Sequence, residues 1–178
     1  LTRPLRSPIV PSVPSAMAAT SAPGYGGGMP RLLVVHYSPT PTVQALADAV
    51  LEGARTAEDE GVEILVRHAL EATTDDVLAA DGFILGTTAN FGYISGALKH
   101  FFDTTYDATH ETTTRKPFSY WIHGGFDTTG AERAMTSITT GYGLRLATPP
   151  LAFTGPPNAE HLEAARELGG TVAWSLAM

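Results

Sequence analysis

The sequence predicts an α/β fold in which a parallel β-sheet is covered by helices on both faces. From Met29 onward, five short apolar runs alternate with longer amphipathic segments, which is the pattern of repeated βαβ units. Right-handed crossovers make a doubly wound open sheet the economical way to connect such units. The chain has 178 residues, which is enough for one domain with a sizeable core.

The first two units follow from the apolar periodicity. Arg31–Tyr37 is short and mostly apolar, as expected of a buried strand. Thr42–Ala57 carries apolar residues at helical spacing and a polar, acidic outer face, so it predicts a helix. Gly61 ends this unit, and Val62–His68 predicts the second strand. A short helix is expected over Thr74–Ala80.

The middle of the chain supplies two more strands. Phe83–Thr87 predicts the third strand, and Ser95–Thr105 predicts a helix with its apolar residues on one side. The polar stretch Asp107–Lys116 then separates this helix from a fourth strand at Phe118–His123.

The last third of the chain predicts two helices around a weak strand. The T-x-x-E pattern from Thr129 to Glu132 matches a capping box and predicts a helix start. Leu144–Phe153 contains a fifth strand that Pro149-Pro150 interrupts, so we expect an edge strand or a loop there. Asn158 is a suitable N-cap for the final helix.

Residues 1–28 differ from the rest of the chain. They contain five of the 13 prolines, four glycines, two arginines and no acidic residue, and they show no apolar period. Such a segment cannot bury enough surface to offset its ordering entropy. We therefore expect a disordered or leader tail, followed by one domain over residues 29–178. The alternative is a secretory signal, because Arg3 and Arg6 precede a partly apolar stretch, but prolines interrupt that stretch.

Composition excludes several functional classes. The chain has no Cys, which excludes disulfides, thiol nucleophiles and Cys-ligated metal clusters. Its net charge of −7 argues against a nucleic-acid partner, because such binders need a basic surface. The longest run of large apolar residues, Leu32–Val35, is far shorter than the roughly 20 residues of a membrane helix. The six His are scattered along the sequence, so we expect no metal site. We expect the protein to be cytoplasmic.

Ligands of open α/β sheets bind beyond the carboxyl ends of the strands, where the strand order reverses. The loop after the first predicted strand, Ser38–Val43, has three hydroxyl residues at a helix N-terminus and no Lys or Arg. This combination suits a phosphate, although Ser and Thr are also common as simple helix caps.

The loops after the third and fourth strands are candidates for contacts with a flat ring. Thr87–Gly96 places two aromatic residues around a glycine, and the alternative is a hydrophobic staple onto the next helix. Gly124-Gly125 allows a close backbone approach, and the alternative is an ordinary strand-to-helix turn.

Three segments together form a recognisable set. They are the loop Tyr37-Ser38-x-Thr40-x-Thr42, the block Ala80–Thr87 followed by Phe91–Phe101, and the loop Gly124-Gly125-x-Asp127-Thr128-Thr129. These segments resemble the phosphate loop, the central block and the G-G-x-E-T-T loop of the flavodoxin-like FMN-binding family, in its WrbA-type quinone reductase and NADPH-dependent FMN reductase branch. The resemblance runs from Met29 to Met178 and implies a five-stranded sheet of order 2-1-3-4-5.

The resemblance also implies a set of cofactor contacts. The FMN phosphate would be held by Ser38, Thr40, Thr42 and Val43. The flavin ring would be lined by Thr88, Asn90, Phe91, Gly92, Tyr93 and Ile94, and bordered on its other side by His123, Gly124 and Gly125. Two positions depart from the family pattern: Pro41 replaces a glycine and removes one N–H group, and Val43 replaces a hydroxyl residue.

The implied function is an oxidoreductase that passes electrons from NAD(P)H through bound FMN to a quinone or similar small-molecule acceptor. His123 is the candidate proton donor, and the alternative is a hydrogen bond that holds the Gly-Gly turn. Because the chain has no thiol, the flavin is the expected redox group. Two other functions stay open: a flavodoxin-type electron carrier, and a flavin-free binding module on the same fold.

Reductases of this family commonly form dimers or tetramers, so a homodimer or tetramer is expected. Phe101–Tyr106 and Asp107–Lys116 are the candidate contact segments, and the alternative for the polar stretch is a solvated loop.

Overall fold

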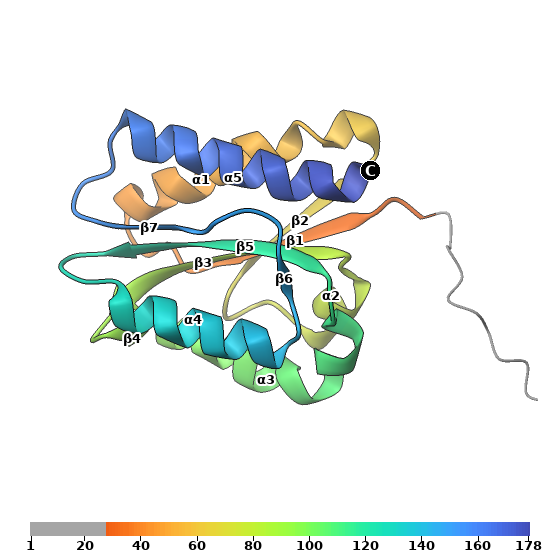
Figure 1. The fold of residues 1–178 in the computed structure, drawn as a ribbon, viewed down its shortest axis with the longest axis horizontal. Coiled ribbons are helices and arrows are strands. Elements are labelled where there is room, and N and C mark those ends of the chain that lie inside the picture. The colour runs from red at the N-terminus through yellow and green to blue at the C-terminus, as the bar shows by residue number, and fades with distance from the viewer. Residues whose placement is uncertain (1–27) are drawn as a thin grey trace, which may run out of the picture.

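The parallel sheet is present in a computed structural model that describes residues 28–178 (Figure 1). Its strand order is β2-β1-β3-β5-β6, with β7 also paired to β5. The predicted order 2-1-3-4-5 is confirmed, because β5 is the fourth predicted strand and β6 with β7 form the fifth. The bounds are β1 Arg31–His36, β2 Glu63–His68, β3 Gly82–Asn90, β5 Pro117–Gly124, β6 Arg145–Leu146 and β7 Leu151–Thr154. The tail expected over residues 1–28 lies outside the described residues except for Gly28, and it stays a prediction.

Helices cover both faces of the sheet, as predicted (Figure 1). One face carries α1 and α5, and the other carries α2, α3 and α4. The bounds are α1 Pro41–Arg55, α2 Thr74–Ala79, α3 Gly96–Thr113, α4 Thr129–Gly141 and α5 Ala159–Ala177, with a short 3₁₀ turn at Glu58–Glu60. Within residues 28–178, no helix combines the length and apolar character needed to cross a membrane.

The central strands are buried on both sides, which explains their continuous apolar runs. Alternate residues of β1 and β3 enter two separate cores. Leu32 and Ile84 pack under α1 and α5, whereas Leu33 and Leu85 pack against α3 and α4.

The α3 helix is longer than predicted. The Asp107–Lys116 stretch is not a loop, because helix continues to Thr113. Its inward positions are threonines at a spacing of four, and Thr105, Thr109 and Thr113 are each 1% exposed. Their hydroxyls donate to backbone carbonyl oxygens, for example Thr109 Oγ1 to the Thr105 carbonyl at 2.8 Å. Polar side chains can therefore form a buried helix face when they satisfy their own hydroxyls.

The region after the third strand also differs from expectation. β3 continues through Asn90 and folds back into a short antiparallel strand, β4 Tyr93–Ile94. The turn between them is formed by Phe91 and Gly92, both with positive φ. Gly92 tolerates this conformation, whereas a bulky side chain at Phe91 seldom adopts it.

The fifth strand is interrupted as the double proline predicts. β6 pairs with the start of β5 and β7 pairs with its end, with Pro149-Pro150 between them. The predicted N-cap at Thr129 is wrong by one residue, because Thr128 occupies that position. Asp127 Oδ1 accepts from the Thr129 N–H at 3.0 Å instead. The predicted cap at Asn158 is confirmed by its capping box with His161.

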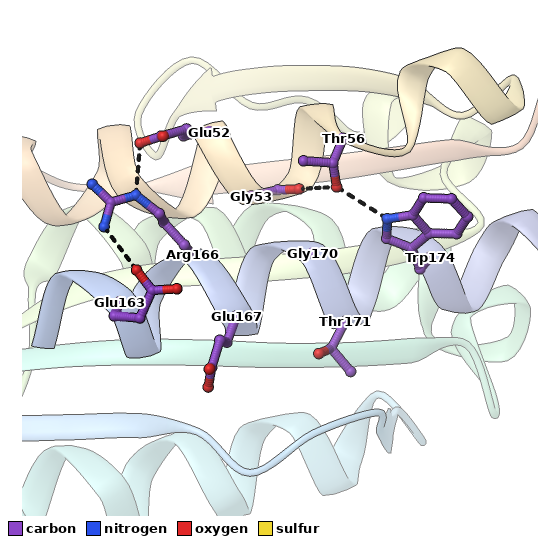
Figure 2. Close-up of a pocket in the computed structure, with 9 residues that line it drawn as sticks. All are labelled: Glu52, Gly53, Thr56, Glu163, Arg166, Glu167, Gly170, Thr171 and Trp174. Carbon is purple, nitrogen blue, oxygen red and sulfur yellow. Dashed lines mark hydrogen bonds and ion pairs between the residues drawn. The ribbon is translucent and has the colours of Figure 1, made fainter. Parts of the chain in front are cut away.

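Helices α1 and α5 approach each other closely because glycines stand at the crossing. A Cβ on Gly169 would lie 1.9 Å from the Val50 carbonyl oxygen, and a Cβ on Gly53 would lie 1.9 Å from the Arg166 carbonyl oxygen. Figure 2 shows the outer rim of this contact, where Arg166 pairs with Glu52 and Glu163 and Trp174 Nε1 donates to Thr56 Oγ1 at 3.0 Å.

This close crossing predicts opposite effects for two neighbouring glycines. Replacing Gly169 by Ala is expected to lower the free energy of unfolding by about 1–3 kcal/mol, because the new methyl group overlaps backbone that cannot move independently. Urea unfolding measures this change.

Gly170→Ala is the matched control. Its Cβ would meet no atom closer than the Gly53 carbonyl oxygen at 3.5 Å. Alanine favours a helix over glycine by about 1 kcal/mol, so this variant should be as stable as the parent or more stable. Equal stability of the two variants would contradict the packing described here.

Candidate functional site

The candidate site lies at the edge of the sheet where β1, β3 and β5 end, called the carboxyl edge below. These strands are neighbours, with His36 beside Gly86 and Thr88 beside His123 in the registers. The loops that follow them therefore meet, although they are far apart in sequence. A Cβ on Gly130 would lie 2.0 Å from the Gly92 carbonyl oxygen, which shows how tightly the β3–β4 turn packs on the start of α4.

The loop after β1 ends in a capped helix N-terminus. Thr40 is the N-cap of α1, and its Oγ1 accepts the Val43 N–H at 3.3 Å. Pro41 is the first helical residue and contributes no N–H. The first turn contains no acidic side chain, so the positive end of the helix dipole is not neutralised locally. This geometry suits an anion, and the Thr40 hydroxyl can still donate its own proton.

A row of ring side chains lies behind that loop. Trp121 crosses over Gly86 toward His36, and the two ring centroids are 5.9 Å apart. Gly86 is required there, because a Cβ would come within 2.0 Å of the indole. His36 is 9% exposed, and its Nδ1 lies 2.9 Å from Ser38 Oγ. Burial lowers the pKa of His36, His68 lowers it further, and Asp48 acts in the opposite direction.

Two buried polar atoms have no hydrogen-bond partner within the described part of the chain. They are the Thr88 Oγ1 and the Trp121 Nε1. Strand alternation places both side chains on the α1–α5 side of the sheet, in the same layer as His36. A buried polar atom without a partner costs about 1–3 kcal/mol, so the Thr88 hydroxyl near the end of β3 points to a ligand group. Trp121 lies in the middle of β5 and is fully buried, so its indole N–H is not open to a ligand.

Aromatic side chains at the same edge are unusually open to solvent. Phe91 and Phe126 are fully exposed, and Tyr93 is 42% exposed. Ile94 is buried in the core instead, so its side chain is not free to line a ring as expected. Exposed apolar rings at a strand end are typical of a surface that a flat ligand covers.

His123 is engaged in a structural hydrogen bond. Its Nε2 lies 2.8 Å from the Gly155 carbonyl oxygen, which can only accept, so Nε2 carries the proton. The ring also packs edge-on against Phe153, at 5.3 Å between centroids. The Gly155 N–H in turn donates to the Gly124 carbonyl at 3.2 Å. His123 thus ties the end of β5 to the turn after β7.

Most of the residues predicted for the site lie together at this edge, and two further residues join them there. Ser38, Thr40, Thr42, Thr88, Asn90, Gly92, His123, Gly124 and Gly125 all lie at the carboxyl edge. His36 and Trp121 lie within predicted strands, and no local pattern marks them as site residues, because their contact reaches across three strands. Within residues 28–178, no group of three or more His, Asp or Glu side chains could hold a metal ion.

The residues present fit an FMN molecule. A capped helix N-terminus with hydroxyl side chains suits its phosphate. The unpartnered Thr88 hydroxyl can serve its polar chain, and the exposed rings of Phe91 and Phe126 can pack on its flat ring system.

Comparisons with known proteins show the family to which the chain belongs. Residues 39–155 match the family described as NADPH-dependent FMN reductase. The chain is 41% identical over 75 residues to a flavodoxin of Aquifex aeolicus, a match that covers 42% of this chain and 40% of that protein. It is 29% identical over 133 residues to an NAD(P)H dehydrogenase (quinone) of Acidithiobacillus ferrooxidans, covering 63% of this chain and 66% of that protein. The chain thus spans less than two thirds of the length of these relatives.

Solved structures share the fold. A flavodoxin from the domain Archaea superimposes with a TM-score of 0.70 at 18% identity, over 83% of this chain and 99% of that one. A WrbA-like flavodoxin from Agrobacterium tumefaciens gives a TM-score of 0.65 at 20% identity, over 83% and 97% of the two chains. The family match covers most of the sheet and the loops of the carboxyl edge, so the chain belongs to the NADPH-dependent FMN reductase family of flavodoxin-like, FMN-binding oxidoreductases.

Proposed function

We propose that this chain binds FMN at the carboxyl edge and passes electrons from NAD(P)H to a quinone or similar small-molecule acceptor. The observation that carries the proposal is the buried Thr88 hydroxyl, which has no hydrogen-bond partner among residues 28–178. It lies at the same edge of the sheet as the N-terminus of α1 and two fully exposed aromatic rings. The Acidithiobacillus relative named NAD(P)H dehydrogenase (quinone) supports the choice of electron donor and acceptor.

In this proposal Ser38, Thr40 and Thr42 hold the phosphate through hydroxyl and backbone donors. Val43 acts indirectly, because its N–H is donated to Thr40 Oγ1 and fixes that side chain. Thr88, Asn90, Phe91, Gly92 and Tyr93 form one side of the ring site, and His123, Gly124 and Gly125 form the other. Ile94 supports the first side from the core, where its side chain is buried. When bound, FMN supplies the redox chemistry, accepting a hydride and returning electrons to an acceptor. The chain itself orients the ring, shields it from water and offers backbone N–H groups to negative charge.

His123 is better suited to positioning than to proton donation. Its Nε2 proton is already donated to the Gly155 carbonyl. We therefore assign to His123 the task of holding the loops after β5 and β7 together at the edge of the ring site.

A flavodoxin-type electron carrier is the second candidate, and the 41% identity to the Aquifex flavodoxin favours it. A carrier is reduced by a partner protein, whereas a reductase is reduced directly by NAD(P)H. A flavin-free binding module is the third candidate, because Pro41 removes one donor from the phosphate loop.

The dimer or tetramer also stays a proposal. Phe101 and Phe102 are 2% and 4% exposed, so within the Phe101–Tyr106 segment Tyr106 is the aromatic ring open to a partner. The Asp107–Lys116 segment offers a helix surface rather than a loop. Light scattering on the purified protein measures the mass.

A flavin titration separates the three functions. We expect the purified protein to bind FMN and the bound flavin to bleach when NADH or NADPH is added without oxygen, with reoxidation by a quinone. Absorbance in the visible range measures both steps. Bleaching only after a partner reductase is added would make the protein a carrier, and failure to take up FMN would exclude both redox functions.

Thr88→Val is expected to weaken FMN binding about tenfold without destabilising the free protein. The reason is that Thr88 Oγ1 has no hydrogen bond to lose within residues 28–178, and replacing a buried unsatisfied hydroxyl by an apolar isostere is neutral or stabilising. FMN fluorescence and urea unfolding measure the two quantities.

Thr87→Val is the control for this experiment. Thr87 Oγ1 accepts from the Ser95 N–H at 3.0 Å and bonds to the Ser95 hydroxyl at 3.0 Å, so this variant should lose stability by about 1–3 kcal/mol. A Thr88→Val protein that is destabilised like Thr87→Val, with unchanged FMN affinity, would contradict the assignment of Thr88.

His123→Ala is expected to lower the free energy of unfolding by about 1–2 kcal/mol, because the Gly155 carbonyl loses its donor. His123→Gln places an amide N–H near the Nε2 position and should recover part of this loss and most of the NADPH-dependent turnover. If His123→Gln is stable but inactive, His123 is a proton donor after all.

A further inference from the structure

The phosphate loop is built without a permanent positive charge. Residues 37–44 contain no Lys or Arg, so a phosphate held there would be balanced only by dipoles and hydroxyls. The titratable side chain directly behind the loop is His36, at the end of β1, whose Nδ1 lies 2.9 Å from Ser38 Oγ.

Ser38 has a single hydroxyl proton, so the direction of its hydrogen bond with His36 depends on whether His36 Nδ1 is protonated. If Nδ1 carries no proton, the Ser38 hydroxyl can donate to it and point away from the loop. If Nδ1 carries a proton, it donates to Ser38 Oγ, and the Ser38 hydroxyl proton is free to point toward an anion. Protonation of the other ring nitrogen as well adds a full positive charge behind the loop.

Other groups around His36 oppose or favour that charge. His68 of β2 lies beside it in the register, and its Nδ1 accepts the Leu70 N–H at 3.2 Å. Asp48 of α1 is the acidic neighbour. From β3 and β5, Gly86 and Trp121 contribute no ionisable side chain. The free protein therefore disfavours a charged His36, and a bound phosphate dianion would reverse the balance.

We propose that His36 takes up a proton when the phosphate of FMN binds, and that it acts through Ser38 as the counter-charge that orients the phosphate loop. His36 is a positioning residue in this role, since Ser38 stands between it and the phosphate. The inference rests on the proposed FMN function and adds a regulation to it: flavin retention becomes stronger as the pH falls.

The lowered pKa of His36 determines how the stability of the free protein depends on pH. Below the unfolded value of about 6.5, the unfolded chain binds a proton that the folded chain resists, so stability falls as the pH decreases. The affinity for the phosphate has the opposite pH dependence and increases as the pH falls, because the bound phosphate stabilises the protonated ring.

Calorimetry on the full chain tests the proposal. FMN is titrated at about pH 7.5, where its phosphate is a dianion because its second pKa is about 6. Two phosphate-free buffers with different ionisation enthalpies give the number of protons taken up. We expect net uptake of up to one proton per FMN. The affinity should fall as the pH rises, by at most about tenfold per pH unit, over the interval between the pKa of His36 in the free protein and its pKa in the complex.

His36→Asn is the matched variant, since its amide can donate to Ser38 but cannot titrate. It should bind FMN with no proton uptake and a flat pH dependence. Ser38→Ala removes the hydrogen bond between His36 and Ser38 but leaves the buried His36 in place. It tests the same coupling if His36→Asn does not fold. Riboflavin, which lacks the phosphate, should bind the parent protein without proton uptake.

The outcomes distinguish the inference from the function on which it rests. FMN binding without proton uptake, or equal uptake in the parent and in His36→Asn, overturns the role of His36 and leaves the FMN function standing. Proton uptake with riboflavin equal to that with FMN also overturns it. Absence of FMN binding at every pH tested overturns both the proposed FMN function and the role of His36.

Discussion

Burial of the parallel sheet on both faces is the constraint from which the rest of this molecule follows. A parallel sheet needs crossover helices, and these cover both of its sides. The central strand β3 therefore sends Ile84 into one core and Leu85 into the other. The same topology brings the ends of β1, β3 and β5 to one edge, so that loops from distant parts of the chain form one site.

The two ends of the sheet differ in how well their polar groups are satisfied. At the amino end, Arg31 pairs with Glu63, and the Lys116 ammonium donates to the Ala80 carbonyl. At the carboxyl edge, the buried Thr88 hydroxyl has no hydrogen-bond partner within residues 28–178. This contrast supports the proposed binding site, because a fold tolerates unsatisfied atoms chiefly where a ligand completes them.

The strands and most helices could be predicted because their signals are local. The apolar run of β1 and the Asn158 cap are read from a few neighbouring residues. The end of α3 could not be predicted in this way, because its inward threonines look polar until their hydroxyls find carbonyl partners. The β3–β4 hairpin was missed for a similar reason, since its turn needs positive φ at Phe91, which an aromatic residue does not signal.

The class of the fold and the positions of most strands and helices follow from the sequence, because apolar periodicity and turn residues act over short distances. The sequence also predicts the loops proposed for ligand binding, but the folded chain alone shows which of their side chains are engaged. In the structure, His123 donates to the Gly155 carbonyl and Ser38 contacts His36. The Thr88 hydroxyl has no hydrogen-bond partner in the described part of the chain. Hydrogen bonds between separate strands and loops depend on how the chain folds back on itself, and no local pattern encodes them.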